Sequence, residues 1–512
     1  MDDVKTGVID PLSNTLYTYV LIYLLVGAGI YFTVRTRAVQ VRLARQMLRV
    51  VVGSRGDSEG GISSFQAFCV GLASRVGTGN IVGVAIALTL GGPGAIFWMW
   101  VVALLGMATA FVEATLGQLF KVRNEDGSFR GGPAYYIQTG LGSRRFAVLF
   151  AVLLIFAFGF AFNMVQANTI GDALSTGHGV STAWTAVGLM ALAAPVLFGG
   201  VRRVASVAGI LLPIMAGAYV LLAVVVVALN IDAVPTVVRQ IVDSAFGLDE
   251  AVAGTAGGIL AAMLNGVKRG LFSNEAGMGS APNTAATATV DHPVKQGLVQ
   301  SLGVFVDTMV VCSATAFMIL VAGPSVYDPG ATTEAVGSAL TTSAVAATLG
   351  TWTTPLMTVL IFVFAFSSVL GNYSYAEVNL AFLGVRGGGL TVLRVLVLAA
   401  VGAGALLSLE LVWALADVAM AFMAIVNLVA IALLGRWALG ALRDYEHQVR
   451  AGSLDGTGRT GRFVATDNPH MPGELPGDIW VARAAVADGG GSSERGPAAR
   501  AVARDTSRPR RT

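Results

Sequence analysis

Ser74-Arg75-Val76-Gly77-Thr78-Gly79-Asn80 and Ser273-Asn274-Glu275-Ala276-Gly277-Met278-Gly279-Ser280 interrupt two of the most apolar stretches of this chain. Each pair of glycines falls where a membrane-spanning helix would otherwise continue, and glycine disfavours a helix by about 1 kcal/mol relative to alanine. Two helices that break at corresponding places in the two halves of a membrane protein are the best sequence indication of the substrate site of a secondary transporter.

The composition is that of a membrane protein. The chain has 512 residues, of which 55% are hydrophobic and 12% charged, and its mean hydropathy is +0.71. A soluble domain carries about 25% charged residues. The apolar runs of roughly 18–30 residues are long enough to cross the membrane as helices, and the alternation that a β-barrel requires is not seen. The sequence therefore predicts an all-α polytopic membrane protein.

The apolar stretches predict about eleven spans. The first is a lead helix over residues 16–34. Ten spans follow, at 66–90, 93–120, 146–170, 182–199, 204–230, 251–290, 297–322, 354–384, 389–409 and 411–435. The broken helices are the first and sixth of these ten, so the second set of five enters the membrane in the opposite orientation. Two inverted five-helix repeats, 66–230 and 251–435, are expected within a transmembrane domain of residues 1–445.

The connections differ in charge. The connections 35–65 and 121–145 are rich in arginine, whereas 171–181 and 323–353 contain no lysine or arginine. The positive-inside rule then places the N-terminus outside and the C-terminus in the cytoplasm. Residues 446–512, rich in Gly, Ser, Pro and Arg, predict a largely disordered cytoplasmic tail, whose arginines could contact anionic membrane lipid.

The chemistry expected at the first break follows from its unwound backbone. Unwound backbone within a membrane is tolerated only where it lines a cavity or packs in protein. Free carbonyls can coordinate sodium, and free N–H groups at the start of a half-helix can hold a carboxylate. Thr78 and Asn80 add polar side chains at the same level. The alternative, close helix packing through small residues, explains one such motif better than a matched pair.

Three further groups of polar residues lie within the spans. Arg75 and Glu275 form a candidate ion pair, which would either lock the two broken helices together or leave Glu275 to bind a cation or a substrate ammonium. Ser367 and Ser368 could bond back to their own helix or complete an oxygen cage around sodium. Asn163 and Gln166 share one face of the third helix.

Several function classes are disfavoured. The sequence contains no phosphate-binding Gly-x-x-x-x-Gly-Lys-Ser/Thr motif, so ATP-driven transport by this chain is not expected. A nucleophile elbow and a zinc-binding helix motif are also absent, so we do not expect an enzyme. No nucleic-acid partner is expected.

Four blocks of sequence resemble the alanine/glycine:cation symporter family, also called sodium:alanine symporters, and the resemblance covers roughly residues 10–445. They are Val76-Gly77-Thr78-Gly79-Asn80-Ile81, Gly91-Gly92-Pro93-Gly94-Ala95-Ile96-Phe97-Trp98-Met99-Trp100, Arg130-Gly131-Gly132-Pro133-Ala134-Tyr135-Tyr136 and the block from Arg269 to Ser280. The resemblance implies a leucine-transporter-like fold in the bacterial plasma membrane. It also implies sodium-coupled uptake of a small neutral amino acid, with alanine and glycine as the first candidate substrates.

The resemblance also implies where the ligands bind. The amino and carboxyl groups of the substrate would lie between the broken helices, near Gln166, and would be held by Thr78, Gly79, Asn80, Ser273, Asn274 and Gly277. Sodium would be held by Ser367 and Ser368 together with helix-one oxygens, for which Gly71 and Ser74 are the candidates.

Some alternatives stay open. Many family members carry Trp-Ser-Tyr-Tyr-Gly-Glu in helix eight, where this chain reads Asn372-Tyr373-Ser374-Tyr375-Ala376-Glu377. Loss of the bulky indole could enlarge the pocket, so serine and glutamine remain possible substrates. Coupling to protons through Glu275, Asp307 or Glu377 is a rival to sodium coupling. A channel or a receptor is a rival from another class, although a channel has no need of two matched helix breaks.

Overall fold

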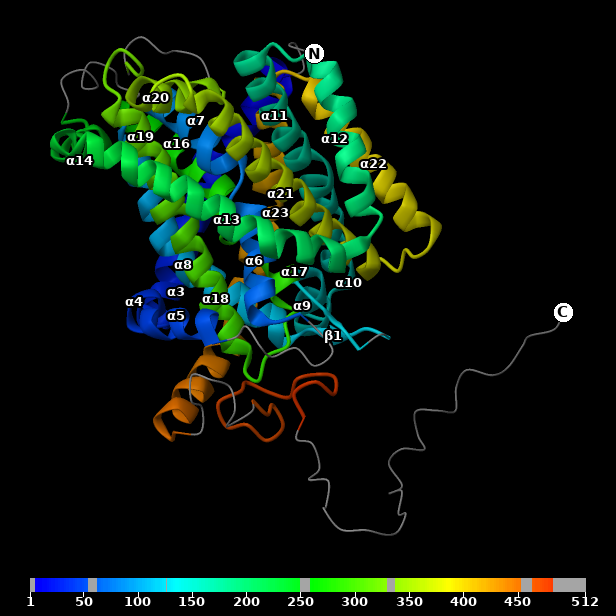
Figure 1. The fold of residues 1–512 in the computed structure, drawn as a ribbon. Helices are drawn as coiled ribbons and strands as arrows, with labels where there is room; N and C mark the ends of the chain where they lie inside the picture. The colour runs from blue at the N-terminus through cyan, green and yellow to red at the C-terminus, as the bar shows by residue number, and fades with distance from the viewer. Residues whose placement is uncertain are drawn as a thin grey trace, which may run out of the picture.

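The computed structural model describes residues 5–53, 62–125, 127–248, 258–328, 337–452 and 463–481. These residues are almost entirely helical (Figure 1). The one sheet in the described part is a short antiparallel pair, β1 (Val122–Arg123) and β2 (Phe129–Arg130). The predicted all-α membrane fold is confirmed.

The first half of the chain begins with a helix that is continuous from residue 5 to 35, and so starts earlier than predicted. It comprises η1 (Lys5–Ile9), α2 (Asp10–Leu16), η2 (Tyr17–Leu21) and α3 (Ile22–Arg35). Five spans follow. They are α6 (Ser64–Arg75) with η3 (Gly79–Gly83) and α7 (Val84–Gly91); α8 (Gly94–Leu119); α10 (Arg144–Leu154) with η4 (Ile155–Ala161) and α11 (Phe162–His178); α12 (Thr182–Leu197); and α13 (Gly200–Leu229).

The second half likewise opens on a broken helix. Its elements are α16 (Gly258–Asn274) and α17 (Ala281–Ala285); α18 (Pro293–Val304) with η6 (Phe305–Cys312) and α19 (Ser313–Val321); α21 (Thr353–Phe382); α22 (Gly388–Leu406); and α23 (Leu409–Arg450). Among the described residues, seven helices are long and apolar enough to cross a membrane, or nine if two bent pairs each count as one span. The span predicted at 182–199 is α12, which is only 16 residues long, and the span predicted at 251–290 is split between α16 and α17.

Short helices occupy connections that the sequence predicted as loops. The helices α4 (Val39–Arg42), α5 (Ala44–Gly53) and α9 (Pro133–Gly140) lie at one end of the bundle, with β1. At the opposite end lie η5 (Ile231–Ala233), α14 (Val234–Ala245) and α20 (Ala339–Leu349) (Figure 1). The two arginine-rich connections therefore lie at the same end of the molecule.

Both predicted helix breaks are confirmed. In the first, α6 ends at Arg75, Val76 is extended (φ −75°, ψ 91°), and the next helical turn begins at Gly79, so the two halves are bent by 51°. In the second, Glu275, Gly277 and Gly279 all have positive φ, at 56°, 87° and 80°. This left-handed region costs an L-residue about 1–2 kcal/mol, and it explains the glycines of the second motif.

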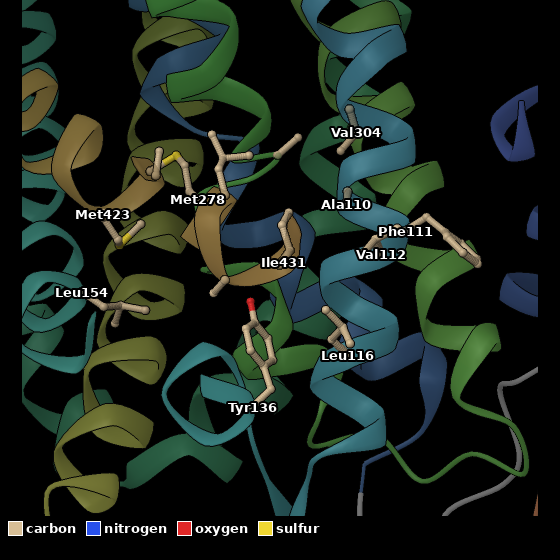
Figure 2. Close-up of a cluster of buried hydrophobic side chains, with 14 of the residues drawn as sticks. Ala110, Phe111, Val112, Leu116, Tyr136, Leu154, Met278, Val304, Met423 and Ile431 are labelled. Atoms are coloured by element: carbon tan, nitrogen blue, oxygen red, sulfur yellow. The ribbon is translucent and has the colours of Figure 1, made fainter. Parts of the chain in front are cut away.

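The second break packs inside the main apolar core. Met278 is fully buried and lies near Met423 and Ile431 of α23, while Ala110 and Leu116 of α8 line the same cluster (Figure 2). Apolar side chains therefore surround a segment whose backbone is not helical, and its polar backbone atoms must find partners within the protein.

The C-terminal region differs from the prediction of a largely disordered tail from residue 446. The helix α23 continues to Arg450, and residues 463–481 pack against the end of the bundle that carries the arginine-rich connections. Phe463 and Trp480 are buried, and the Trp480 indole donates a hydrogen bond to the Gln118 carbonyl (3.1 Å). Large aromatic side chains give this segment enough apolar surface to dock. Residues 453–462 and 482–512 lie outside the described part.

His292 lies beneath this docked segment, directly before α18. Its Nε2 is 3.1 Å from Asp444 Oδ2, and its ring packs against Tyr445 and Phe463. Burial lowers the pKa of His292, although Asp444 opposes that shift. The imidazole is therefore neutral at pH 7, which agrees with its Nδ1 accepting a hydrogen bond from the Val294 amide.

The conformation of the second break predicts how a substitution at Gly279 affects stability. An alanine Cβ there would have to adopt positive φ and would lie 2.7 Å from Pro133 Cγ and 2.8 Å from Asn427 Cγ. We expect Gly279→Ala to lower the free energy of unfolding by more than the ~1–2 kcal/mol of the backbone term alone. The measurement is the thermal unfolding midpoint of the protein purified in detergent.

The matched control is Gly188→Ala in α12, where a Cβ meets nothing within 4 Å. That change should leave the midpoint unchanged or raise it, because alanine favours a helix. Equal midpoints for the two variants would contradict the account of the break.

Candidate functional site

The two broken helices meet at the side chain of Asn80. Its Nδ2 donates to Ser273 Oγ (3.0 Å) in helix six and to Asp307 Oδ1 (2.7 Å). Its Oδ1 accepts a hydrogen bond from the Gly77 amide (2.9 Å). One fully buried amide therefore satisfies the unwound turn of helix one and joins it to helix six.

Asp307 lies in the wider π-helical turn η6 of the seventh helix. Its Oδ2 accepts from Ser273 Oγ (2.7 Å) and Thr308 Oγ1 (2.9 Å). The carboxylate is fully buried and forms none of the ion pairs found among the described residues. The sequence indicated Asp307 only as a possible proton carrier, although an ionisable residue inside a span is itself a functional-site signal.

The helix α11, which is the second part of helix three, supplies the hydrogen-bond partner of Thr78. Gln166 Oε1 accepts from both the Thr78 amide (3.1 Å) and the Thr78 hydroxyl (2.6 Å). The predicted residues Thr78, Asn80, Gln166 and Ser273 are thus brought together in one buried polar network. Gly79 belongs with them, because a Cβ at Gly79 would lie 3.0 Å from Phe272 and 3.1 Å from the Ser273 Cα.

Two of the predicted substrate residues lie elsewhere. The Gly277 amide donates to Glu113 Oε1 (3.2 Å) in α8, and its carbonyl accepts from Asn427 Nδ2 (2.9 Å) in α23. Asn274 Oδ1 accepts from the Ala276 amide (3.0 Å) and so caps its own turn. Asn274 and Gly277 therefore stabilise the break on the side facing α8 and α23, and neither hydrogen-bonds to the network around Asn80.

Glu113 and Asn427 are functional candidates that sequence reasoning missed. The two oxygens of Glu113 accept hydrogen bonds from the Gly277 amide and, at 3.1 Å, the Gly279 amide, the first two glycine N–H groups of the break. Asn427 Nδ2 also donates to Glu113 Oε2 (2.8 Å). The available signal was a carboxylate at the centre of a predicted span, but its partner 164 residues away is a backbone amide, which side-chain patterns do not show.

The four predicted sodium residues are not gathered at one point. Ser368 Oγ lies within hydrogen-bond distance of the Ala73 carbonyl (3.0 Å) at the end of α6 and of the Phe364 carbonyl (3.1 Å) of its own helix. Ser367 Oγ bonds back to the Phe364 carbonyl of its own helix (2.9 Å). Gly71 faces α17 and α18, since a Cβ there would lie 3.1 Å from Gln300 Oε1 and 3.3 Å from Thr284 Oγ1.

Ser74 links α6, the first part of helix one, to α21, which is helix eight. Its hydroxyl lies 2.7 Å from Asn372 Oδ1 and 3.1 Å from Glu275 Oε1. Asn372 in turn donates from Nδ2 to Asn163 Oδ1 (3.1 Å). Asn372 is therefore part of a polar chain running from helix one to helix three.

The predicted ion pair between Arg75 and Glu275 is not formed. Arg75 Nη1 donates to the Gln300 carbonyl (3.2 Å). Glu275 Oε2 accepts from Ser280 Oγ (2.5 Å), and its other oxygen faces Ser74. The left-handed backbone of Glu275 turns its side chain to local hydroxyls, so matching positions in the two motifs did not give matching directions.

An aromatic stack closes one side of this network. The Phe272 ring stacks on Phe162 (centroids 4.5 Å apart, 10° between planes) and contacts Trp413 (4.4 Å). Phe162 stacks in turn on Phe158. These rings come from α11 and the preceding η4, from α16 and from α23, and the Phe272 ring lies against Gly79.

The sequence of the chain identifies its relatives. Residues 1–457 match the model of the sodium:alanine symporter family. The chain belongs to the sodium:alanine symporter family. It is therefore a multi-pass membrane transporter and not an enzyme.

Individual members of the family are similar over most of their length. The chain is 45% identical over 453 residues to a probable sodium/glutamine symporter, GlnT, of Bacillus subtilis (88% of this chain, 93% of the relative). It is 46% identical over 452 residues to the amino-acid carrier protein AlsT of the same organism (88% and 94%). It is 39% identical over 434 residues to the sodium/alanine symporter AgcS of Methanococcus maripaludis (83% and 94%).

Solved structures are more distant. A manganese transporter of Eremococcus coleocola aligns with a TM-score of 0.46 at 15% identity, over 77% of this chain and 72% of that one.

Proposed function

We propose that this symporter family member couples the inward movement of sodium to the uptake of a small neutral amino acid by alternating access. The observation that carries the proposal is the junction of the two unwound segments, where Asn80 of helix one bonds directly to Ser273 of helix six. A ligand held at this junction would touch both halves of the protein, so its binding could bias the movement of one against the other.

The polar groups at the junction suit a zwitterion. Thr78, Gly79, Asn80, Ser273 and Gln166 provide hydroxyl and amide groups, and the half-helix that begins at Gly79 turns its positive end toward the break. A carboxylate would gain from that positive end of the half-helix. The narrower set of five replaces the seven residues predicted, because Asn274 and Gly277 serve the other side of the break.

Sodium is proposed to bind where α6 ends. The last carbonyls of a helix have no partner within it, and half-helix C-termini coordinate sodium in transporters with broken helices. Ser368 lies at this point, within 3.0 Å of the Ala73 carbonyl. Ser367, Gly71 and Ser74 have other neighbours in the described conformation and are weaker candidates.

The aromatic stack favours a small substrate. Phe272 lies beside Gly79 and packs against Phe162 and Trp413, and a large ring held next to the backbone of the break limits the space for a side chain. Alanine and glycine are therefore the first candidates. Serine and glutamine remain alternatives, and the name of the similar protein GlnT specifies glutamine.

The proposed setting is the bacterial plasma membrane, with the N-terminus outside and the C-terminus in the cytoplasm. The arginine-rich connections and the docked segment 463–481 share one end of the bundle (Figure 1), and the positive-inside rule assigns that end to the cytoplasm.

Proton coupling is the rival that one observation favours. Asp307 is a fully buried carboxylate whose partners are neutral groups, and such a group could carry a proton across the membrane. A proton-coupled carrier would take up its substrate in response to a pH gradient in sodium-free buffer.

The direct test is uptake of labelled alanine by proteoliposomes. We expect an inward sodium gradient to raise the initial rate at least tenfold over equal potassium, because sodium supplies the driving force. An imposed pH gradient without sodium should have no such effect. Equal uptake with and without the sodium gradient would eliminate sodium coupling, and uptake driven by pH alone would establish the rival.

A second prediction concerns the two binding points. Asn80→Ala removes the link between the broken helices and should abolish uptake at normal membrane expression. Ser368→Ala should raise the sodium concentration for half-maximal uptake severalfold. Ser367→Ala is the matched control, because that hydroxyl contacts the Phe364 carbonyl of its own helix and Met215 of α13, and not helix one, and it should transport like wild type. If Ser367→Ala changes the sodium dependence more than Ser368→Ala, the proposed sodium site is misplaced.

A further inference from the structure

Arg75 has hydrogen-bonding capacity that the site described above does not use. It is the last residue of α6 and is only 2% exposed. One nitrogen, Nη1, donates to the Gln300 carbonyl, whereas Nε and Nη2 have no acceptor in the protein. A buried guanidinium is costly in a membrane, and such residues usually face a pathway or a partner.

The nearby carboxylates do not supply the missing acceptor. Glu113, Glu275 and Asp307 all lie close enough to feel the charge of Arg75. None of them is within ion-pair distance of it, because each is engaged by hydroxyl, amide or backbone groups. Arg75 therefore lies near three carboxylates without forming an ion pair with any of them.

Further orphan polar atoms lie on α18, on the side of the helix that approaches Arg75. Gln300 Nε2 and both amide atoms of Gln296 are buried without a hydrogen-bond partner in the protein. Gln296 and Gln300 are one helical turn apart and share a face. A Cβ at Gly303, almost one turn further, would lie 2.6 Å from Arg75 Nη1, so this face leads to the guanidinium.

The direction of this polar face follows from the fold. The helix α18 begins at Pro293 and packs against α5 at the end of the bundle that carries the arginine-rich connections. Gln296, Gln300 and then Arg75 are thus met in order from that end toward the break. The charge pattern assigns that end to the cytoplasm.

The free edge of Arg75 matches one ligand chemistry well. Nε and Nη2 lie on the same edge of the planar guanidinium, and their N–H groups point in one direction. Two parallel donors of this kind bind a carboxylate in a bidentate manner. The transported amino acid carries such a group at its α-carbon.

We propose that Arg75 is a second, transient carboxylate-binding site, which receives the substrate on its way from the helix breaks to the cytoplasm along the polar face of α18. This inference rests on the proposed function. It adds a second binding site on the cytoplasmic side of Asn80. This site would bind the substrate through the charged guanidinium of Arg75, whereas the first site would bind it through neutral side chains and backbone groups.

The test compares the two sides of the membrane. Initial rates of alanine transport are measured in right-side-out and inside-out bacterial membrane vesicles, with KM determined from each side. Arg75→Gln should raise the KM at the cytoplasmic side at least tenfold and change the external KM less than twofold. Arg75→Lys keeps the charge but loses the bidentate edge, so it should raise the cytoplasmic KM by a smaller factor of about three.

The matched control is Arg269→Gln. Arg269 is also a buried arginine of a broken helix, but it pairs with Asp417, so its loss should lower expression or affect both sides equally. A cytoplasmic KM that is unchanged in both Arg75 variants, or that changes equally with the external one, would overturn the inference. If Arg75→Gln is not expressed, the lysine variant decides alone. Absence of saturable alanine transport by the wild type would instead refute the proposed function.

Discussion

Backbone groups that leave a helix within a membrane must find partners inside the protein, and this constraint shapes the centre of the molecule. Water is not there to satisfy them, and each unsatisfied group costs several kcal/mol. At the first break the amides of Gly77 and Thr78 bond to Asn80 and Gln166. At the second, those of Gly277 and Gly279 bond to the carboxylate of Glu113. Side chains from three different helices are thereby committed to two short segments.

These hydrogen bonds also determine which part of the site can rearrange when a ligand binds. The groups that satisfy the first break are uncharged hydroxyls and amides, which an ion or a zwitterion can replace at modest cost. The groups at the second break on the α8 side are a carboxylate and an asparagine, which hold the left-handed turn firmly. Asn80 joins the two through Ser273. We infer that the first break is the adaptable half of the site and the second its rigid support.

The sequence predicted the features that depend on residue type along the chain. The length of the apolar stretches predicted the helices, the paired glycines predicted both breaks, and Thr78, Asn80, Gln166 and Ser273 meet as expected. The prediction failed where the direction of a side chain decides its contacts. Arg75 and Glu275 occupy matching positions, but positive φ at Glu275 sends its side chain to Ser280. Gly277 belongs to the right motif but faces Glu113. The sequence predicted a largely disordered tail where Phe463 and Trp480 dock, because two aromatic residues in a polar segment are a weak signal until their contact surface is known.

The central claim is that residues 76–80 bind the ion and the substrate, and hydrogen–deuterium exchange of the purified protein tests it most directly. Exchange is followed by mass spectrometry in sodium with alanine, in sodium alone and in potassium. The account predicts slower exchange at the amides of residues 77–80 with sodium and alanine than with potassium, with little change at residues 277–279, which Glu113 already holds. Exchange at 77–80 that is identical in all three conditions, with protection appearing elsewhere in the bundle, would contradict it.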